Sequence, residues 1–305
     1  MKNSPFLSFI KLSRPFFLLG GAGQFILGVG IANYLGRNID WTVFGVGLGW
    51  VLTMQLATHY LNEYFDAFFD QFRTNRTPFS GGSGVLGEGE DQLPRNVALV
   101  AAVGMLTITT FFTLNLIWTH HLNLSIGVVM VTIFLLAFFF SVPPVKLSQS
   151  GYGELATAFL VANLIPAFGF MLQTGEIHHL VSLATIPLTF NLLPVLLTIQ
   201  FPDYLTDVKF RKRNLLVKLG WENAMSIHNT FILFSFIILG VVSLFGLPSS
   251  ISIPAFLPLP LGLLQIWQMR RISAGLKPNW TTLILNAIVS FGLMSYMLAF
   301  GFWTR

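Results

Sequence analysis

The sequence predicts an all-α integral membrane protein, with about nine transmembrane helices around a central cavity that opens to the cytoplasmic face. Of its 305 residues, 54% are hydrophobic and only 10% are charged, with a mean hydropathy of +0.71. A water-soluble fold of this composition would expose a large apolar surface, which excludes an ordinary soluble enzyme. The apolar runs are also unbroken over about 20 residues, the length that a helix needs to cross a bilayer core of about 30 Å. A transmembrane β-barrel would instead alternate over about 10 residues.

Nine apolar runs are expected to span the membrane. They lie at 16–36, 41–64, 96–118, 122–142, 153–174, 179–201, 224–246, 251–268 and 280–303. The stretch before the first run contains Lys11, Arg14 and Pro15, which favours a short interfacial helix over a cleaved signal peptide. We expect residues 1–305 to form one membrane domain, with the site carried by loops at about 65–95, 143–152 and 202–222.

The basic residues indicate how the chain is oriented. With nine spans, the N-terminus and four loops share one side of the membrane, and this side holds every Lys and Arg except Arg37 and Arg305. The positive-inside rule places that side in the cytoplasm, and we expect a multi-pass protein of a prokaryotic inner membrane. The net charge of +5 comes from loops that adjoin apolar spans. It therefore indicates anionic lipid headgroups or an anionic substrate as partners, and no nucleic acid. Because cysteine is absent, thiolate nucleophiles and cysteine metal sites are excluded.

Two acidic motifs end two of the predicted spans on the cytoplasmic side. In NEYFDAFFD, Asn62, Asp66 and Asp70 are spaced at i, i+4 and i+8, which places them along one stripe of a helix. In FPDYLTD, Asp203 and Asp207 have the same spacing, and each lies 137 residues after its counterpart in the first motif. Four carboxylates on one cavity would repel one another unless a cation lay among them.

Oxygen ligands without His or Cys favour Mg2+, which usually binds one or two carboxylates together with substrate phosphates. The alternative is that these carboxylates are simply solvated at helix ends, but two matched pairs on one face favour the metal site. Candidate partners for a bound anion surround the motifs: Arg73, Arg76, Lys146, Lys209, Arg211, Lys212, Arg213 and the SGGSG run at 80–84. His59, one turn before Asn62, is a candidate for contact with a second substrate, although a lone membrane histidine is more often a packing residue.

These motifs resemble those of the UbiA-type membrane prenyltransferases, in number and in order along the chain. The family patterns NDxxDxxxD, YSxPPxxLK and DxxxD with following bases correspond here to NEYFDAFFD (62–70), FSVPPVKL (140–147) and DYLTDVKFRKRNLLVKLG (203–220). Three residues depart from the family pattern. Glu63 replaces an Asp, Phe140 stands where a Tyr is common, and Asn214 stands where a Thr is common.

The resemblance implies Mg2+-dependent transfer of a polyprenyl chain from an allylic diphosphate to an aromatic acceptor. It implies that Mg2+ is bound by Asn62, Asp66, Asp70, Asp203 and Asp207, and that diphosphate oxygens are held by Lys146, Arg73, Arg76 and Arg211. The segment PFSGGSGVL and the DYxxD form of the second motif are most similar to enzymes that act on 1,4-dihydroxy-2-naphthoate in menaquinone synthesis.

Two alternatives remain open at the level of sequence. Within the same family, the acceptor could be 4-hydroxybenzoate, homogentisate, chlorophyllide, haem or a glycerol-type lipid. Outside it, a secondary transporter could use intramembrane carboxylates for ion coupling, but such carboxylates tend to lie near the membrane midplane between inverted repeats. The two motifs here end on the same side of the membrane, which favours a catalytic cavity.

Overall fold

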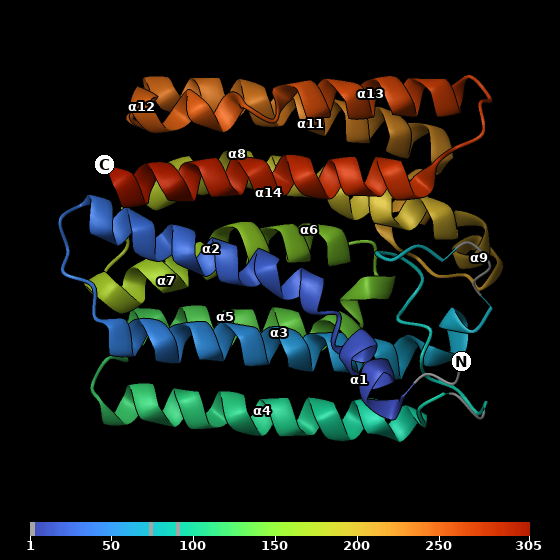
Figure 1. The fold of residues 1–305 in the computed structure, drawn as a ribbon, viewed down its shortest axis with the longest axis horizontal. Helices are drawn as coiled ribbons and strands as arrows, with labels where there is room; N and C mark the ends of the chain where they lie inside the picture. Colours follow the sequence, from blue (N-terminus) through green and yellow to red (C-terminus); the bar gives the residue numbers. More distant parts are fainter. Residues whose placement is uncertain (1–3, 73–75, 90–91) are drawn as a thin grey trace.

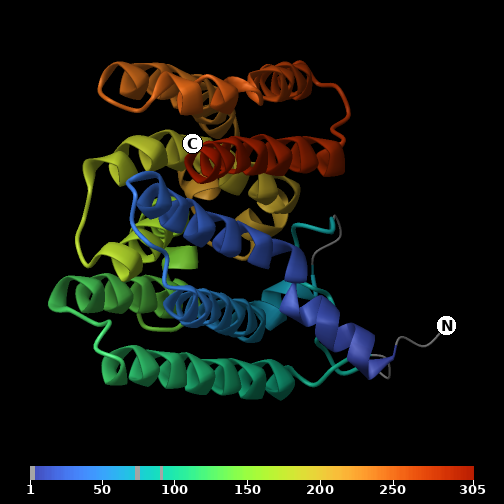
Figure 2. The same ribbon diagram turned by 60° about the vertical axis from the view of Figure 1, so that its left-hand side comes forward.

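The computed structural model describes residues 4–72, 76–89 and 92–305 as a helical bundle (Figures 1 and 2). Within these ranges, nine helical segments are long and apolar enough to cross a membrane, in agreement with the predicted number. The helices are α1 (Pro5–Ser13), α2 (Pro15–Tyr34), α3 (Trp41–Asp70), α4 (Arg95–Trp118), α5 (Leu124–Ser141), α6 (Gly153–Phe159), α7 (Ile165–Thr174), α8 (His179–Gln200), α9 (Tyr204–Lys209), α10 (Leu215–Leu219), α11 (Trp221–Leu244), α12 (Ser249–Ser252), α13 (Leu259–Ser273) and α14 (Trp280–Thr304).

Proline residues explain where the spans depart from single straight helices. The fifth span joins α6 to α7 through a π-helical turn, Leu160–Leu164, just before Pro166, which has no N–H to donate within the helix. The eighth span is divided into α12, a 3-10 turn at Pro254–Phe256, and α13, because Pro254, Pro258 and Pro260 interrupt it. The apolar run predicted at 251–268 lies within this span, Ser249–Ser273, and the prolines divide it into shorter helical pieces.

The core is formed where α2, α7, α8 and α14 pack together, while α4 lies at the edge against α3 (Figure 1). The close approach of α2 and α7 depends on Gly28, because a Cβ there would overlap the backbone of Pro166. Buried polar side chains pair across the bundle, as where Gln24 donates to Ser295 at 2.8 Å. Helix α4 exposes apolar side chains such as Val100 and Phe111, which suits a surface that faces lipid.

Helix α3 brings the first acidic motif to one end of the bundle. Its 30 residues correspond to a length of roughly 45 Å at 1.5 Å per residue, which exceeds the hydrocarbon core of a bilayer. Asp40 begins the helix by accepting hydrogen bonds from the backbone N–H groups of Thr42 and Val43. The opposite end of α3, the segment 76–89, α9 and α1 lie together at the same end of the molecule (Figure 1).

Candidate active site

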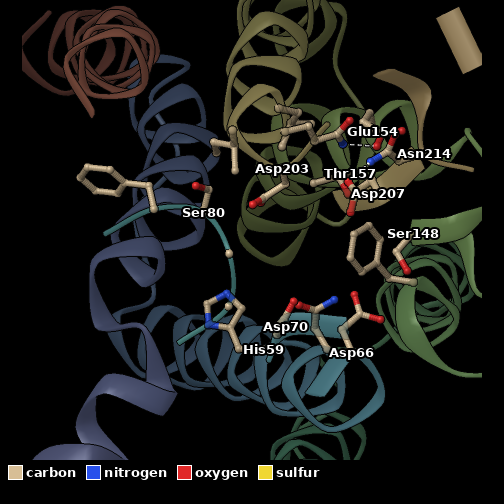
Figure 3. A pocket seen from close by; sticks show the side chains of 18 of the residues that line it. His59, Asp66, Asp70, Ser80, Ser148, Glu154, Thr157, Asp203, Asp207 and Asn214 are labelled. Atoms are coloured by element: carbon tan, nitrogen blue, oxygen red, sulfur yellow. Dashed lines mark hydrogen bonds between the residues drawn. The ribbon is translucent and has the colours of Figure 1, made fainter. Parts of the chain in front are cut away.

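A cavity of about 270 Å³ lies between the ends of α3 and α8, and both acidic motifs face it (Figure 3). Asp66 and Asp70 line it from α3, while Asp203 and Asp207 line it from the opposite side. All four side chains are buried, the most exposed being Asp70 at 8%. The sequence spacing therefore predicted correctly that these carboxylates face one cavity.

The two motifs differ in how the backbone carries them. Helix α3 is uninterrupted to Asp70, so Asn62 also lines the cavity, and its amide donates to the Ser141 hydroxyl at 3.2 Å. The second motif does not continue α8. The chain forms a 3-10 turn at Phe201–Asp203 and then the separate helix α9, because Pro202 interrupts the helix.

Two lysines from different loops approach the same carboxylate in the cavity. The Lys146 ammonium lies 3.5 Å from one oxygen of Asp66, and the Lys212 ammonium lies 3.2 Å from the other. Lys146 has a left-handed backbone, with φ of 44°, which is unfavourable for a residue other than glycine and is often found at functional sites. Lys212 also lines the cavity, whereas Lys146 is not one of its lining residues and reaches the same carboxylate from beside it.

The other predicted anion-binding residues lie differently. Arg76 is exposed and donates to the backbone carbonyl of Asp70, so it stabilises the end of α3 and does not line the cavity. Arg211 is also exposed, with φ of 56°, and its neighbour Lys212 is the residue that reaches the cavity. Arg73 lies outside the described residues.

Glycine-rich residues 80–84 pass over the cavity, as the SGGSG run suggested. Ser80, Gly81 and Gly82 line it. Gly82 has φ of +75°, and a Cβ at this position would overlap the carboxylate of Asp70. The backbone therefore approaches Asp70 more closely than any other residue type would allow.

Several lining residues were not predicted as site residues. They include Arg14, Thr58, Ser148, Glu154, Thr157 and Asn214. Asn214 donates to Asp207 at 2.7 Å, so this departure from the family pattern still touches an acidic residue of the site. Ser148 is buried, and its hydroxyl has no hydrogen-bond partner among the residues that the structure describes. Thr58 lies four residues before Asn62, on the stripe that Asn62, Asp66 and Asp70 form, so the period of the first motif could have identified it. Ser148, Glu154 and Thr157 lie outside both motifs, and no such spacing marks them.

A second, apolar cavity of about 290 Å³ continues inward from the first. The two share a boundary formed by Phe17, Thr58, His59, Phe79, Phe140, Thr157, Leu196 and Ile199. Along α3 the apolar cavity extends from His59 back to Trp50, a rise of roughly 14 Å. The space is therefore polar and acidic at the end of the bundle and apolar within it.

His59 lies at this boundary with a defined tautomer. Its Nδ1 is 3.2 Å from the backbone carbonyl of Ser13. A carbonyl can only accept a hydrogen bond, so Nδ1 carries the proton and Nε2 is the acceptor nitrogen of the neutral ring. The imidazole projects from α3 toward the cavity (Figure 3).

The donor set fits Mg2+. The cavity offers carboxylate and amide oxygens and no sulfur, and Mg2+ prefers such hard ligands. Among the described residues, no three His, Asp or Glu side chains form a ready-made metal cluster.

The fold and the cavity define a polytopic helical membrane protein with a binding space that is polar at one end and apolar at the other. A model of the UbiA prenyltransferase family matches residues 24–288, and the chain belongs to this family. The resemblance drawn from the three sequence motifs is thereby confirmed at the level of the family. Family membership also identifies the protein as an enzyme, a prenyltransferase, and decides against the transporter alternative.

Solved structures of the same fold cover nearly the whole chain. A UbiA homolog from Archaeoglobus fulgidus bound to GPP and Mg2+ is 16% identical, with a TM-score of 0.66 over 95% of this chain and 99% of that one. Digeranylgeranylglyceryl phosphate synthase is 12% identical, with a TM-score of 0.65 over 98% of this chain and 99% of that one. A UbiA homolog from A. fulgidus bound to DMAPP and Mg2+ is 15% identical, with a TM-score of 0.61 over 95% of this chain and 99% of that one. No curated protein sequence matches the chain.

Proposed function

We propose that this prenyltransferase moves a polyprenyl chain from an allylic diphosphate to an aromatic acceptor with the help of Mg2+, and that the acceptor is 1,4-dihydroxy-2-naphthoate. The observation that carries the proposal is the continuity of the acidic cavity with the apolar one. An allylic diphosphate has a charged head and a long apolar tail, and this space has a matching division. The A. fulgidus structures with GPP and DMAPP, each with Mg2+, show that the fold can hold such molecules.

The diphosphate head belongs in the acidic cavity. Asp66, Asp70, Asp203 and Asp207 would hold Mg2+, with Asn62 beside them, and bound Mg2+ would neutralise the charge that develops on the departing diphosphate. Lys146 and Lys212 can turn from Asp66 to the phosphate oxygens, since their flexible stems and compact charges allow several geometries.

The reacting carbon of the prenyl chain then lies at the boundary of the two cavities. Its bond to the diphosphate oxygen breaks, the electron pair leaves with the diphosphate, and a ring carbon of the acceptor forms the new bond. Phe17, Phe79 and Phe140 surround this point and exclude water from the allylic cation. Phe140 carries no hydroxyl, so the reaction in this enzyme does not use a tyrosine hydroxyl at this position.

The acceptor must lose a proton from its ring carbon, or CO2 where that carbon bears a carboxyl group. Nε2 of His59 is the nitrogen able to accept a hydroxyl proton from the acceptor at the boundary. The segment PFSGGSG, on which the similarity to naphthoate-using enzymes rests, contributes Phe79 and Ser80 to the same region. Phe17 and Phe79 lie edge to face at 6.4 Å, an apolar setting for a fused aromatic ring.

The acceptor can be tested with the purified protein in lipid nanodiscs, radiolabelled geranyl diphosphate and a panel of acceptors. We expect prenylated product with 1,4-dihydroxy-2-naphthoate, release of diphosphate, and loss of both in EDTA. The variant Asp203→Asn is the inactive control. Product with 4-hydroxybenzoate or homogentisate alone would refute the naphthoate assignment, and product that persists in EDTA would refute the metal requirement.

We also propose that the acidic cavity faces the cytoplasm, because nearly all bases of the sequence fall in loops on that side. The absence of cysteine makes this testable, since a single introduced cysteine is the only one in the chain. In intact cells, Arg37→Cys should react with a membrane-impermeant maleimide, and Arg213→Cys should react only after the membrane is opened. The reverse pattern would overturn the orientation.

A further inference from the structure

Two glutamates, Glu63 and Glu154, are buried near the four aspartates that face the acidic cavity. Glu63 is 3% exposed and lies within the first motif, on α3. Glu154 is 6% exposed and lies at the start of α6, far from both motifs in sequence. A buried carboxylate needs strong partners, so the groups that each one holds indicate its role.

Glu63 holds the glycine-rich segment over the cavity. One of its oxygens accepts from the backbone N–H of Ser83 at 2.8 Å, and the other accepts from the Ser83 hydroxyl at 2.6 Å. Arg14, at the junction of α1 and α2, forms an ion pair with the same carboxylate. Ser83 follows Gly82, whose backbone lies against the carboxylate of Asp70. Glu63 is therefore linked to Asp70 through Ser83 and Gly82.

Glu154 has the corresponding relation to the second motif. One of its oxygens accepts from the side-chain amide of Gln200, the last residue of α8. The other accepts from the backbone N–H of Leu215 at 3.3 Å, at the start of α10. Asn214, the residue before, donates to Asp207 at 2.7 Å. Glu154 is therefore linked to Asp207 through Leu215 and Asn214.

The correspondence extends to position, because Asp70 and Asp207 occupy equivalent places in the two motifs, 137 residues apart. We infer that Glu63 and Glu154 are positioning residues, each of which anchors the segment that follows one motif and so fixes the last aspartate of that motif for Mg2+. This inference rests on the proposed function. It assigns Glu63, which replaces an Asp of the family pattern, to loop anchoring and not to metal coordination.

Glutamine is the substitution of choice, because it keeps the size of the side chain and replaces one acceptor oxygen by a donor. Glu63→Gln removes the charge that pairs with Arg14 and weakens the acceptor of the Ser83 N–H, and Glu154→Gln sets an NH2 group against the Leu215 N–H or the Gln200 amide. Each substitution therefore loosens its segment. Residues that support metal ligands in this way typically change metal affinity by about 10- to 100-fold. The matched control is Glu176→Gln, since Glu176 is exposed and pairs with Arg37 at 2.9 Å on another part of the chain.

The experiment measures binding of radiolabelled geranyl S-thiolodiphosphate, a substrate analogue that is not consumed, to protein in nanodiscs across a Mg2+ titration. For both variants we expect the Mg2+ concentration at half-maximal binding to rise about tenfold or more. Binding at saturating Mg2+ and the melting temperature should stay close to wild type. Glu176→Gln should match wild type throughout.

An unchanged Mg2+ requirement in both folded variants would overturn the inference, and so would the same shift in Glu176→Gln. Loss of analogue binding at every Mg2+ concentration would also overturn it, because that result would indicate a direct ligand. If Glu63→Gln does not fold, Ser83→Ala carries the test, because it removes one hydrogen bond of the same anchor. If Glu63→Gln does fold, its effect and that of Ser83→Ala should be less than additive in the double variant. This binding assay requires no acceptor. It therefore tests the inference even if the acceptor experiment yields no prenylated product.

Discussion

Lys212 and Arg211 are adjacent bases of which the structure brings only one to the cavity, so they form a matched pair for mutation. The Lys212 ammonium lies 3.2 Å from Asp66, and its side chain is 12% exposed. At an effective dielectric of about 20, two unit charges at this distance attract by about 5 kcal/mol before desolvation is counted. Net contributions of hydrogen bonds to charged groups are smaller, about 1.5–3 kcal/mol. Replacing Lys212 with Met should therefore weaken diphosphate binding by about 10- to 100-fold.

Steady-state kinetics with varied geranyl diphosphate at saturating Mg2+ and acceptor would measure this effect. We expect Lys212→Met to raise KM for the diphosphate over that range, and Arg211→Gln to change it by less than about threefold, as for an exposed surface charge. The opposite order, with Arg211→Gln the more damaged variant, would show that the cavity does not bind the diphosphate through Lys212. It would support Arg211, the base to which the family resemblance assigned this role.

Three further substitutions test the site and the fold. Gly82→Ala should sharply reduce activity, because it forces a side chain into a left-handed backbone and against a carboxylate, whereas Gly104→Ala, in open space, should not. Gly28→Ala should lower the melting temperature through overlap with the neighbouring helix, at a cost of about 1–3 kcal/mol, while Gly23→Ala, which meets nothing within 4 Å, should not. Replacing His59 with Gln should lower kcat by about 10²- to 10⁴-fold with little change in KM for the diphosphate, as measured by product formation. An unchanged kcat would exclude His59 as the base.

The sequence was sufficient for the membrane class and the number of spans, and for placing the residues of the first acidic motif on one face of a helix. The placement of the motif succeeds because α3 is one regular helix, so that the spacing of Asn62, Asp66 and Asp70 translates directly into a common face. The prediction was less complete for the second motif. There Pro202 interrupts the helix, and the spacing of Asp203 and Asp207 alone does not reveal the 3-10 turn.

Side chains beyond the regular helices could not be placed from the sequence. Helix α9 ends at Lys209, and Arg211 then adopts a left-handed backbone, so the helical period no longer tells which neighbouring base faces the cavity. Glu154 presents a different problem. An acid in the first turn of a helix is usually explained by the helix dipole, and only the tertiary fold shows Gln200 and Leu215 as its partners.

The two halves of the site consequently depend on different supports. The backbone of Asp66 and Asp70 is fixed by the hydrogen bonds of a long helix, so Glu63 has only to place the segment that lies against the Asp70 carboxylate. Asp207 is carried by the six residues of α9, too short to be stable alone, so its position depends on Asn214 and thus on Glu154. Loss of the glutamate anchor should therefore perturb the second motif more than the first. A larger Mg2+ shift in Glu154→Gln than in Glu63→Gln would be the sign of that difference.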